Sequence, residues 1–356
     1  MPQFAARYIL IPALIGAIIG GALLLLDYTK TIEKPGYAKA VDQAASSVVN
    51  IYSNKIIRRK TPPICQLERF KDWCEMYSDS GRRMQSSLGS GVIVRSNGYI
   101  LTNNHVIADA DEILVAFADG QAAAATLVGA DVETDLAVIK VEAQGLQPIE
   151  IGASDSVRVG DIALAIGNPF GIGQTVSMGI ISAKGRAGIS ASPYDDFMQT
   201  DAAINPGNSG GALINTDGEL IGLNTLIYSR SGGSEGIGFA IPSKLALSVV
   251  DEVVSQGFVT RGWLGIILEN APDNRTVGLQ VTGIRRGGPA FTAGVLPGDL
   301  LLSVNDIPAV SSRAITRKIA QVAPGDPIHL DIIRNGETQT LEATAGQRPY
   351  NRPEPQ

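Results

Sequence analysis

Residues 91–102 read GVIVRSNGYILT, two apolar stretches separated by Asn97 and Gly98. An Asn-Gly pair adopts the left-handed backbone of a two-residue hairpin turn, so the stretches on either side are predicted to pair as antiparallel strands. Two Asp-Gly pairs also separate apolar stretches: Asp119-Gly120 and Asp217-Gly218. Many short strands at regular spacing indicate a β-barrel or a β-sandwich, and residues 46–241 are predicted to be all β.

The pattern changes to a helical spacing of apolar residues after Pro242, and Gly257 ends that helix. Strands return between Arg261 and about Thr344, with one helix expected near residues 312–322. The C-terminal end is polar and rich in proline, which predicts disorder. The predicted boundaries are a first domain at 46–257, a second at 258–345 and a disordered tail at 346–356.

Residues 9–26, ILIPALIGAIIGGALLLL, carry no charge and are long enough to cross a bilayer core. A cleaved signal peptide is the alternative, but no clear cleavage site of small residues follows Leu26. We therefore expect an uncleaved transmembrane anchor at 9–26, a cytoplasmic stretch at 1–8, a tether at 27–45 and an exported remainder.

The composition bears on partners and on the redox compartment. The net charge is −6 and there is no long basic run, which does not favour binding to nucleic acid. The chain has two cysteines, Cys65 and Cys74, close together in a polar stretch. In an exported chain they are expected to form a disulfide that closes a small loop, with two unpaired thiols as the alternative.

Residues 205–213 read NPGNSGGAL and place Ser209 among glycines. A tight turn is one interpretation. A phosphate-binding loop fits poorly, because the Gly-Lys-Ser/Thr ending is missing. The third interpretation is a serine nucleophile beside backbone N–H groups that bind an oxyanion, and it requires a histidine base and a carboxylate elsewhere.

The chain has two histidines. His329 lies in an alternating strand, PIHLDII, where a structural role is expected, whereas His105 follows the strand in YILTNNHVI. Asp135 directly precedes an apolar strand in VETDLAVIKV. His105, Asp135 and Ser209 then supply base, orienting carboxylate and nucleophile in the order used by chymotrypsin-type barrels. The isolated histidines predict neither a metal site nor a cofactor.

TNNHV, TDLAV and GNSGGAL, in this order and spacing, resemble the HtrA serine proteases over residues 45–345, and most closely their membrane-anchored DegS/AlgW subgroup. The resemblance implies a mostly β chain, with a chymotrypsin-like double β-barrel followed by one PDZ domain and preceded by a transmembrane helix. The activity expected is that of a serine endopeptidase.

The residue types give each group its role. Ser209 attacks the peptide carbonyl, His105 accepts and later donates the proton, and Asp135 stabilises the imidazolium. The oxyanion hole is predicted at Gly207, Asn208 and Ser209, with the N–H groups of Gly207 and Ser209 as its donors. The substrate pocket is assigned to the residues that follow the Asp217-Gly218 hairpin: Thr225, Leu226 and Ile227.

GWLGI at residues 262–266 resembles the loop with which PDZ domains bind a C-terminal carboxylate. An ordinary strand start is the alternative, and GGPAFTAGVLPGDLLLSVN at 287–305 favours the PDZ interpretation. The predicted peptide-binding residues are Gly262, Trp263, Leu264, Gly265 and Ile266. A helix carrying Ala314, Ile315 and Ile319 is expected to line the groove.

The resemblance also implies regulation. C-termini of outer-membrane proteins would bind the PDZ domain and relieve inhibition through residues 181–190, so that a membrane-bound anti-sigma factor is cut. Arg186 matches the activating arginine, with a solvated loop arginine as the alternative. A homotrimer at the bacterial inner membrane, with its domains in the periplasm, is expected. A general quality-control protease of the DegP type and a non-enzymatic binding module are the competing functions.

Overall fold

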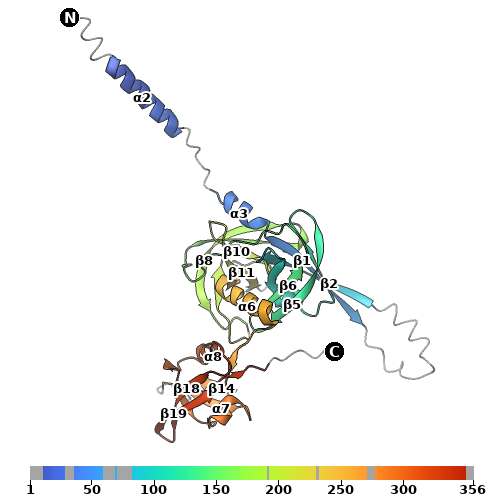
Figure 1. Cartoon of the computed structure of the whole chain (residues 1–356), viewed down its shortest axis with the longest axis vertical. Helices are drawn as coiled ribbons and strands as arrows, with labels where there is room; N and C mark the ends of the chain where they lie inside the picture. Colours follow the sequence, from blue (N-terminus) through green and yellow to red (C-terminus); the bar gives the residue numbers. More distant parts are fainter. Residues whose placement is uncertain are drawn as a thin grey trace. The chain divides into compact units, whose positions relative to one another are not determined.

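The computed structural model describes residues 11–28, 36–58, 69, 82–190, 192–229, 232–270 and 277–349 (Figure 1). The chain divides into two compact units, Met1–Lys39 and Ala40–Gln356. The first unit contains helix α2 (Ile11–Tyr28), which overlaps the stretch expected to form the anchor, residues 9–26. Among the described residues, no helix is both long enough and apolar enough to cross a membrane. Cys65 and Cys74 fall outside the described residues, so their pairing stays a prediction.

The end of the predicted tether is helical. Helix α3 (Ala38–Ala45) carries two alanines, Ala40 and Ala44, that are buried. The hairpin turn at Gly218 fits closely against α3, because a Cβ at Gly218 would lie 2.9 Å from the Ala40 carbonyl oxygen. The last part of the expected tether is therefore helical, and residues 40–45 pack on the folded domain through Ala40 and Ala44.

The described strands between Val48 and Val141 form a closed antiparallel barrel, which decides between the predicted barrel and sandwich. The hairpin at Asn97-Gly98 is confirmed, since Val92 pairs with Leu101 across it. Its turn is longer than the two residues predicted: Gly98 has φ of 94° but Asn97 is not left-handed, and the Gly98 N–H donates to the Arg95 carbonyl at 3.0 Å. Inward-facing aliphatic side chains fill the barrel interior. In sheet order its strands are β1 (Val48–Arg58), β2 (Arg82–Ile93), β3 (Tyr99–Asn103), β6 (Leu136–Val141), β5 (Ala122–Asp131) and β4 (Glu112–Ala116).

A second closed barrel follows, with its own apolar core. The hairpin predicted at Asp217-Gly218 joins two of its strands, and Gly218 has φ of 86° there. In sheet order the strands are β10 (Ala212–Ile214), β11 (Leu220–Ile227), β12 (Gly238–Pro242), β9 (Phe197–Thr200), β8 (Thr175–Arg186) and β7 (Ile162–Gly167).

Helix α6 (Ser243–Gln256) ends the double barrel, as its sequence predicts. Gly257 adopts φ of 86° and its N–H donates to the Val253 carbonyl at 2.8 Å, which closes the helix. The buried face of α6 packs on β11 and β12 of the second barrel and on β5 and β6 of the first. Figure 1 shows α6 beside β11, β5 and β6. One helix therefore contacts both barrels.

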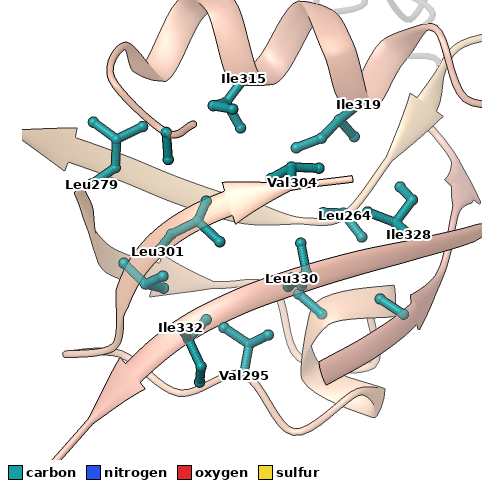
Figure 2. Packing of buried hydrophobic residues seen from close by; sticks show 14 of the residues in the cluster. Leu264, Leu279, Val295, Leu301, Val304, Ile315, Ile319, Ile328, Leu330 and Ile332 are labelled. Carbon is teal, nitrogen blue, oxygen red and sulfur yellow. The ribbon is translucent and has the colours of Figure 1, made fainter. Parts of the chain in front are cut away.

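The C-terminal domain is a sheet in the order β14 (Ile266–Asn270), β15 (Leu279–Ile284), β16 (Leu300–Val304), β18 (Pro327–Arg334) and β19 (Glu337–Thr344), with β17 (Ile307–Pro308) paired to β16. Two helices, α7 (Pro289–Thr292) and α8 (Ser312–Ala320), complete it. Figure 2 shows Ile315 and Ile319 of α8 directed into the apolar core, toward Val304. These two side chains are buried in the domain core, and the expectation that their helix lines a peptide groove stays a prediction.

Part of the predicted tail belongs to the domain. Strand β20 (Gly346–Gln347) pairs with β13 (Gly262–Trp263), and the Arg348 N–H donates to the Arg261 carbonyl at 2.9 Å. The pairing satisfies backbone groups at both ends of the domain. The domain thus extends to Arg348, beyond the predicted boundary at residue 345.

Candidate active site

His105 and Asp135 meet where strand β3 ends. A short helix, α5 (Asn104–Ile107), follows β3 and carries His105, and Asp135 closes the turn before β6 with φ of 55°. The His105 ring Nδ1 lies 2.6 Å from Asp135 Oδ2, and the His105 backbone N–H donates to Asp135 Oδ1 at 2.9 Å. One carboxylate therefore holds the ring and the main chain of His105 together, and it leaves Nε2 for other partners.

The Asp135 turn is itself tied to β3. The Asp135 carbonyl accepts hydrogen bonds from the Asn104 N–H at 3.0 Å and from the Asn103 side-chain amide at 2.9 Å. These bonds hold Asp135 in the left-handed backbone region, which costs free energy for a residue with a side chain. Because Asn103, Asn104 and His105 are adjacent in the sequence, their hydrogen bonds to Asp135 together orient its carboxylate.

Thr225 forms hydrogen bonds with two members of the predicted triad, Asp135 and Ser209. Its hydroxyl donates to Asp135 Oδ2 at 3.0 Å, and its backbone carbonyl accepts the Ser209 hydroxyl at 2.9 Å. Thr225 is buried, with 2% of its surface exposed. Its side chain therefore supports the carboxylate, and its predicted place in a substrate pocket stays a prediction. The sequence holds no local signal for this role, because Thr225 and Asp135 are far apart in the chain.

Ser209 lies in residues 205–211, the segment before β10 that we term the nucleophile loop. Its hydroxyl donates to Thr225, and within the described residues no hydrogen bond joins it to His105. Catalytic hydrogen bonds are often absent before substrate binds and form in the complex. The structure therefore gathers His105, Asp135 and Ser209 around Thr225, with the serine hydroxyl turned to a backbone carbonyl.

The nucleophile loop presents free N–H groups. Across the described residues, the N–H groups of Gly207 and Ser209 have no hydrogen-bond acceptor, whereas the Asn208 N–H donates to the Asn205 carbonyl at 3.0 Å. Gly207 has φ of 104°, a conformation that favours glycine. Two of the three residues predicted for the oxyanion hole thus keep a free donor, and the Asn208 N–H is occupied.

The next two glycines are required by close packing. A Cβ at Gly210 would lie 2.1 Å from the Ser90 carbonyl oxygen, and a Cβ at Gly211 would lie 2.2 Å from the Ile166 carbonyl oxygen. Gly210 also has φ of 81°. Ser209 is therefore surrounded by glycine because the loop lies directly against the backbone of both barrels.

Three other predicted site residues lie on strands of the second barrel. Leu226 and Ile227 continue β11 after Thr225 and are half-buried. Arg186 is the last residue of β8, is exposed, and donates from Nε to Gln199 Oε1 at 3.1 Å. Their roles in substrate binding and regulation stay predictions.

The GWLGI stretch combines a core residue with an open strand edge. Leu264 is buried, with 1% exposed, so its side chain belongs to the domain core. Gly265 has φ of 73°, and its carbonyl accepts the Arg285 N–H at 2.7 Å. Ile266 begins β14, the first strand of the sheet order, which leaves one edge of β14 open beside α8.

The loop also contacts the helix and a cation. A Cβ at Gly262 would lie 2.3 Å from the carbonyl oxygens of Ile319 and Val322, so glycine lets the loop reach the end of α8. The Arg285 guanidinium lies 5.8 Å from the centre of the Trp263 ring. The start of this domain therefore has the free strand edge and the nearby positive charge that suit a peptide carboxylate.

Known proteins resemble the chain over nearly its whole length. Residues 89–223 match a trypsin-like peptidase domain, and residues 262–344 match a PDZ domain. The serine endoprotease DegS of Escherichia coli is 40% identical over 361 residues, which cover 94% of this chain and 96% of DegS. A probable periplasmic serine endoprotease, DegP-like, of Ectopseudomonas mendocina is 38% identical and covers 95% of this chain, which spans 75% of the relative.

Solved structures agree. The HtrA-type protease AlgW with a decapeptide has a TM-score of 0.78 at 44% identity, and the match covers 88% of this chain and 99% of that chain. AlgW with a tripeptide has a TM-score of 0.77 at 47% identity, over 89% of this chain and 98% of that chain. The chain therefore belongs to the HtrA family and is a serine endoprotease that joins a trypsin-like peptidase domain to one PDZ domain.

Proposed function

We propose that Ser209 is the nucleophile, His105 the general base and acid, and Asp135 the group that orients the imidazole. The observation that carries this proposal is the pair of hydrogen bonds that the Asp135 carboxylate accepts from His105. Thr225 hydrogen-bonds to both Asp135 and Ser209, which places the serine beside this pair. A carboxylate on Nδ1 fixes the ring so that Nε2 faces the nucleophile.

In the proposed reaction the Ser209 hydroxyl turns from the Thr225 carbonyl to His105 Nε2, which removes its proton as Oγ attacks a peptide carbonyl. The N–H groups of Gly207 and Ser209 stabilise the oxyanion, and Asp135 stabilises the imidazolium. His105 then protonates the leaving amine. Water, activated by the same imidazole, releases the acyl group from Ser209.

Fluorophosphonate labelling followed by intact-mass measurement tests this assignment. We expect one adduct, at Ser209, with Ser209→Ala as the unlabelled control. His105→Ala should slow labelling by a factor of about 10⁴ or more, because activation of the hydroxyl is lost. An adduct that persists in Ser209→Ala would overturn the assignment of the nucleophile.

We further propose that the open edge of β14, beside α8, binds the C-terminus of an extended peptide. Main-chain hydrogen bonds to the strand edge would give affinity, and the N–H groups around Gly265 would hold the carboxylate. The AlgW structures with a decapeptide and a tripeptide support this proposal, since AlgW shares the PDZ arrangement. Titration with decapeptides that differ only in a free or amidated C-terminus tests it, and equal affinity would contradict it.

The cellular role proposed is that of a stress sensor anchored in the inner membrane by residues 9–26. C-termini of outer-membrane proteins would bind the PDZ domain, and a homotrimer would then make the first cut in a membrane-bound anti-sigma factor, with Arg186 carrying the signal. The support is the similarity to DegS, which is 40% identical over 96% of that protein. The domains would lie in the periplasm, where the DegP-like relatives are named as acting.

The alternative is a general periplasmic quality-control protease, which the resemblance to DegP-like proteins favours. Digestion of unfolded casein separates the two. The sensor should leave casein largely intact while fluorophosphonate labelling rises with a C-terminal peptide, and rapid digestion without peptide would support quality control. Membrane fractionation of the full chain and of residues 37–356 tests the anchor, and sedimentation of residues 37–356 tests the trimer.

A further inference from the structure

Ser90 lies in the LGSGV stretch of β2, with 0% of its surface exposed. Gly89 and Gly91 flank Ser90, and neighbouring side chains leave no room for a Cβ at either position. A Cβ at Gly89 would lie 2.5 Å from Val106 Cγ1, and a Cβ at Gly91 would lie 2.7 Å from Ile100 Cγ2. This part of β2 therefore packs directly on α5, the helix that carries His105. The position of Ser90 is set by the first barrel.

Ser90 makes two hydrogen bonds to the nucleophile loop of the second barrel. Its backbone N–H donates to the Ser209 carbonyl at 2.8 Å, and its hydroxyl donates to the Gly207 carbonyl at 2.7 Å. The hydroxyl also accepts the Asn168 N–H at 3.0 Å, and the Ser90 carbonyl accepts the Thr102 hydroxyl at 2.7 Å. Ser90 thus has every polar group satisfied while it joins the two barrels.

These bonds fix one peptide plane of the loop. The Gly207 carbonyl is held by the Ser90 hydroxyl, and the N–H of the same peptide unit, from Asn208, is held by the Asn205 carbonyl at 3.0 Å. The N–H groups on either side, from Gly207 and Ser209, keep no acceptor within the described part of the chain. Holding this plane is what leaves those two N–H groups free to meet an oxyanion.

We propose that Ser90 is a positioning residue that aims the oxyanion-binding N–H groups of Gly207 and Ser209 from the opposite barrel. The inference rests on the proposed role of Ser209. Without the hydroxyl, the buried Gly207 carbonyl loses its donor, and a glycine with wide backbone freedom is released to rotate. Stabilisation of developing charge depends on donors fixed before the reaction, so the chemical step should slow while binding is retained.

The test is the reaction of a fluorophosphonate with Ser209, resolved into the maximal rate constant and the half-saturating concentration. The reaction is measured under conditions in which the fluorophosphonate labels the wild-type chain. Loss of a whole oxyanion donor costs about 10²–10³ in rate, and Ser90→Ala, which only loosens two donors, should lower the maximal rate constant about tenfold or more. The half-saturating concentration should stay within about twofold, because probe binding does not need the oxyanion contacts.

Ser243→Ala is the matched control. Ser243 has 1% of its surface exposed, and its hydroxyl donates to the Gly152 carbonyl at 3.0 Å, away from the nucleophile loop. Both variants lose one buried hydrogen bond and should lose similar stability, but Ser243→Ala should label at the wild-type rate. Ser90→Cys keeps the side-chain volume with a weaker donor, should give an intermediate rate, and replaces Ser90→Ala if that variant does not fold.

The outcomes separate the two proposals. Wild-type labelling at Ser209 with an unchanged rate constant in Ser90→Ala would overturn the positioning role alone. Equal slowing in Ser90→Ala and Ser243→Ala would also overturn it, because the effect would then follow general loss of packing. Labelling of the wild-type chain at a residue other than Ser209 would overturn the nucleophile assignment itself.

Discussion

Single residues set the site through hydrogen bonds that reach across the sequence. Thr225 donates its hydroxyl to Asp135 at 3.0 Å while Asp135 holds His105. A hydrogen bond to a charged group contributes about 1.5–3 kcal/mol, here to the orientation of a carboxylate. Thr225→Val should therefore lower the maximal labelling rate about tenfold with little change in fold. Thr225→Ser keeps the hydroxyl, so its maximal labelling rate should stay near that of the wild type. Equal rates for Thr225→Val and Thr225→Ser would refute this role.

Gly210 tests the close approach of loop and barrel. Gly210 and Gly120 have similar φ, 81° and 85°, but a Cβ at Gly210 would lie 2.1 Å from a backbone oxygen, whereas nothing lies within 4 Å of one at Gly120. Gly120→Ala should cost only the backbone strain, of order 1 kcal/mol. Gly210→Ala adds a collision with Ser90 and should abolish labelling. Urea unfolding and labelling of both variants check this, and equal stability of the two would contradict the packing argument.

At the scale of elements, an ion pair ties the end of β18 to the turn before β16. Arg334 donates to both carboxylate oxygens of Asp299, at 2.7 and 2.6 Å, and the Leu296 N–H donates to the same group at 2.8 Å. Burial by itself raises the pKa of Asp299, but these hydrogen bonds and the Arg334 charge lower the pKa below its ordinary value. The ionised carboxylate is therefore favoured in the folded domain.

A pKa lowered by folding gives stability that is complete above the unfolded value, about 3.9, and is lost as the pH falls through the folded value. The free energy of unfolding of the wild-type chain should thus exceed that of Asp299→Asn at pH 7, and the difference should shrink below about pH 4. Urea unfolding of the full chain from pH 7 to pH 3 measures it. A constant difference over that range would mean that Asp299 ionisation does not support the fold.

The whole molecule is joined at Arg261, which follows α6 and precedes β13. Its guanidinium pairs with both carboxylate oxygens of Asp131 at the end of β5, and the two side chains are 12% and 6% exposed. The guanidinium also lies 4.6 Å from the centre of the Tyr194 ring. The first barrel is therefore linked to the start of the PDZ domain by a buried charge pair.

Removing one partner leaves a buried charge, which destabilises a fold by about 3–5 kcal/mol. Arg261→Met should accordingly lower the stability of the full chain by about that amount. The double variant Arg261→Met with Asp131→Leu, which removes both charges, should recover much of the loss. Calorimetric unfolding of the wild-type chain, of Arg261→Met and of the double variant measures these stabilities. If the double variant recovers no stability, the contact of Arg261 with Tyr194 dominates.

Most of the architecture could be predicted from local sequence, and the parts that could not depend on distant contacts. The backbone preferences of Asn97-Gly98 predict a hairpin, and those of Gly257 predict the end of a helix. Ser90 and Thr225 carry no such signal, because a strand hydroxyl acquires its role from a carbonyl or carboxylate that is 117 or 90 residues away. The GWLGI motif predicts Leu264 in a peptide-binding loop, whereas the packing of the folded core decides that its side chain is buried.

The helix α6 has a consequence for synthesis. It packs on strands of both barrels and ends at Gly257, so neither barrel has its full complement of contacts until about residue 257 has been made. His105, Asp135 and Ser209 are all present in the chain well before that point. A growing chain would therefore carry the reactive groups before the frame that aligns them is complete, so peptidase activity should appear only after α6 has been made.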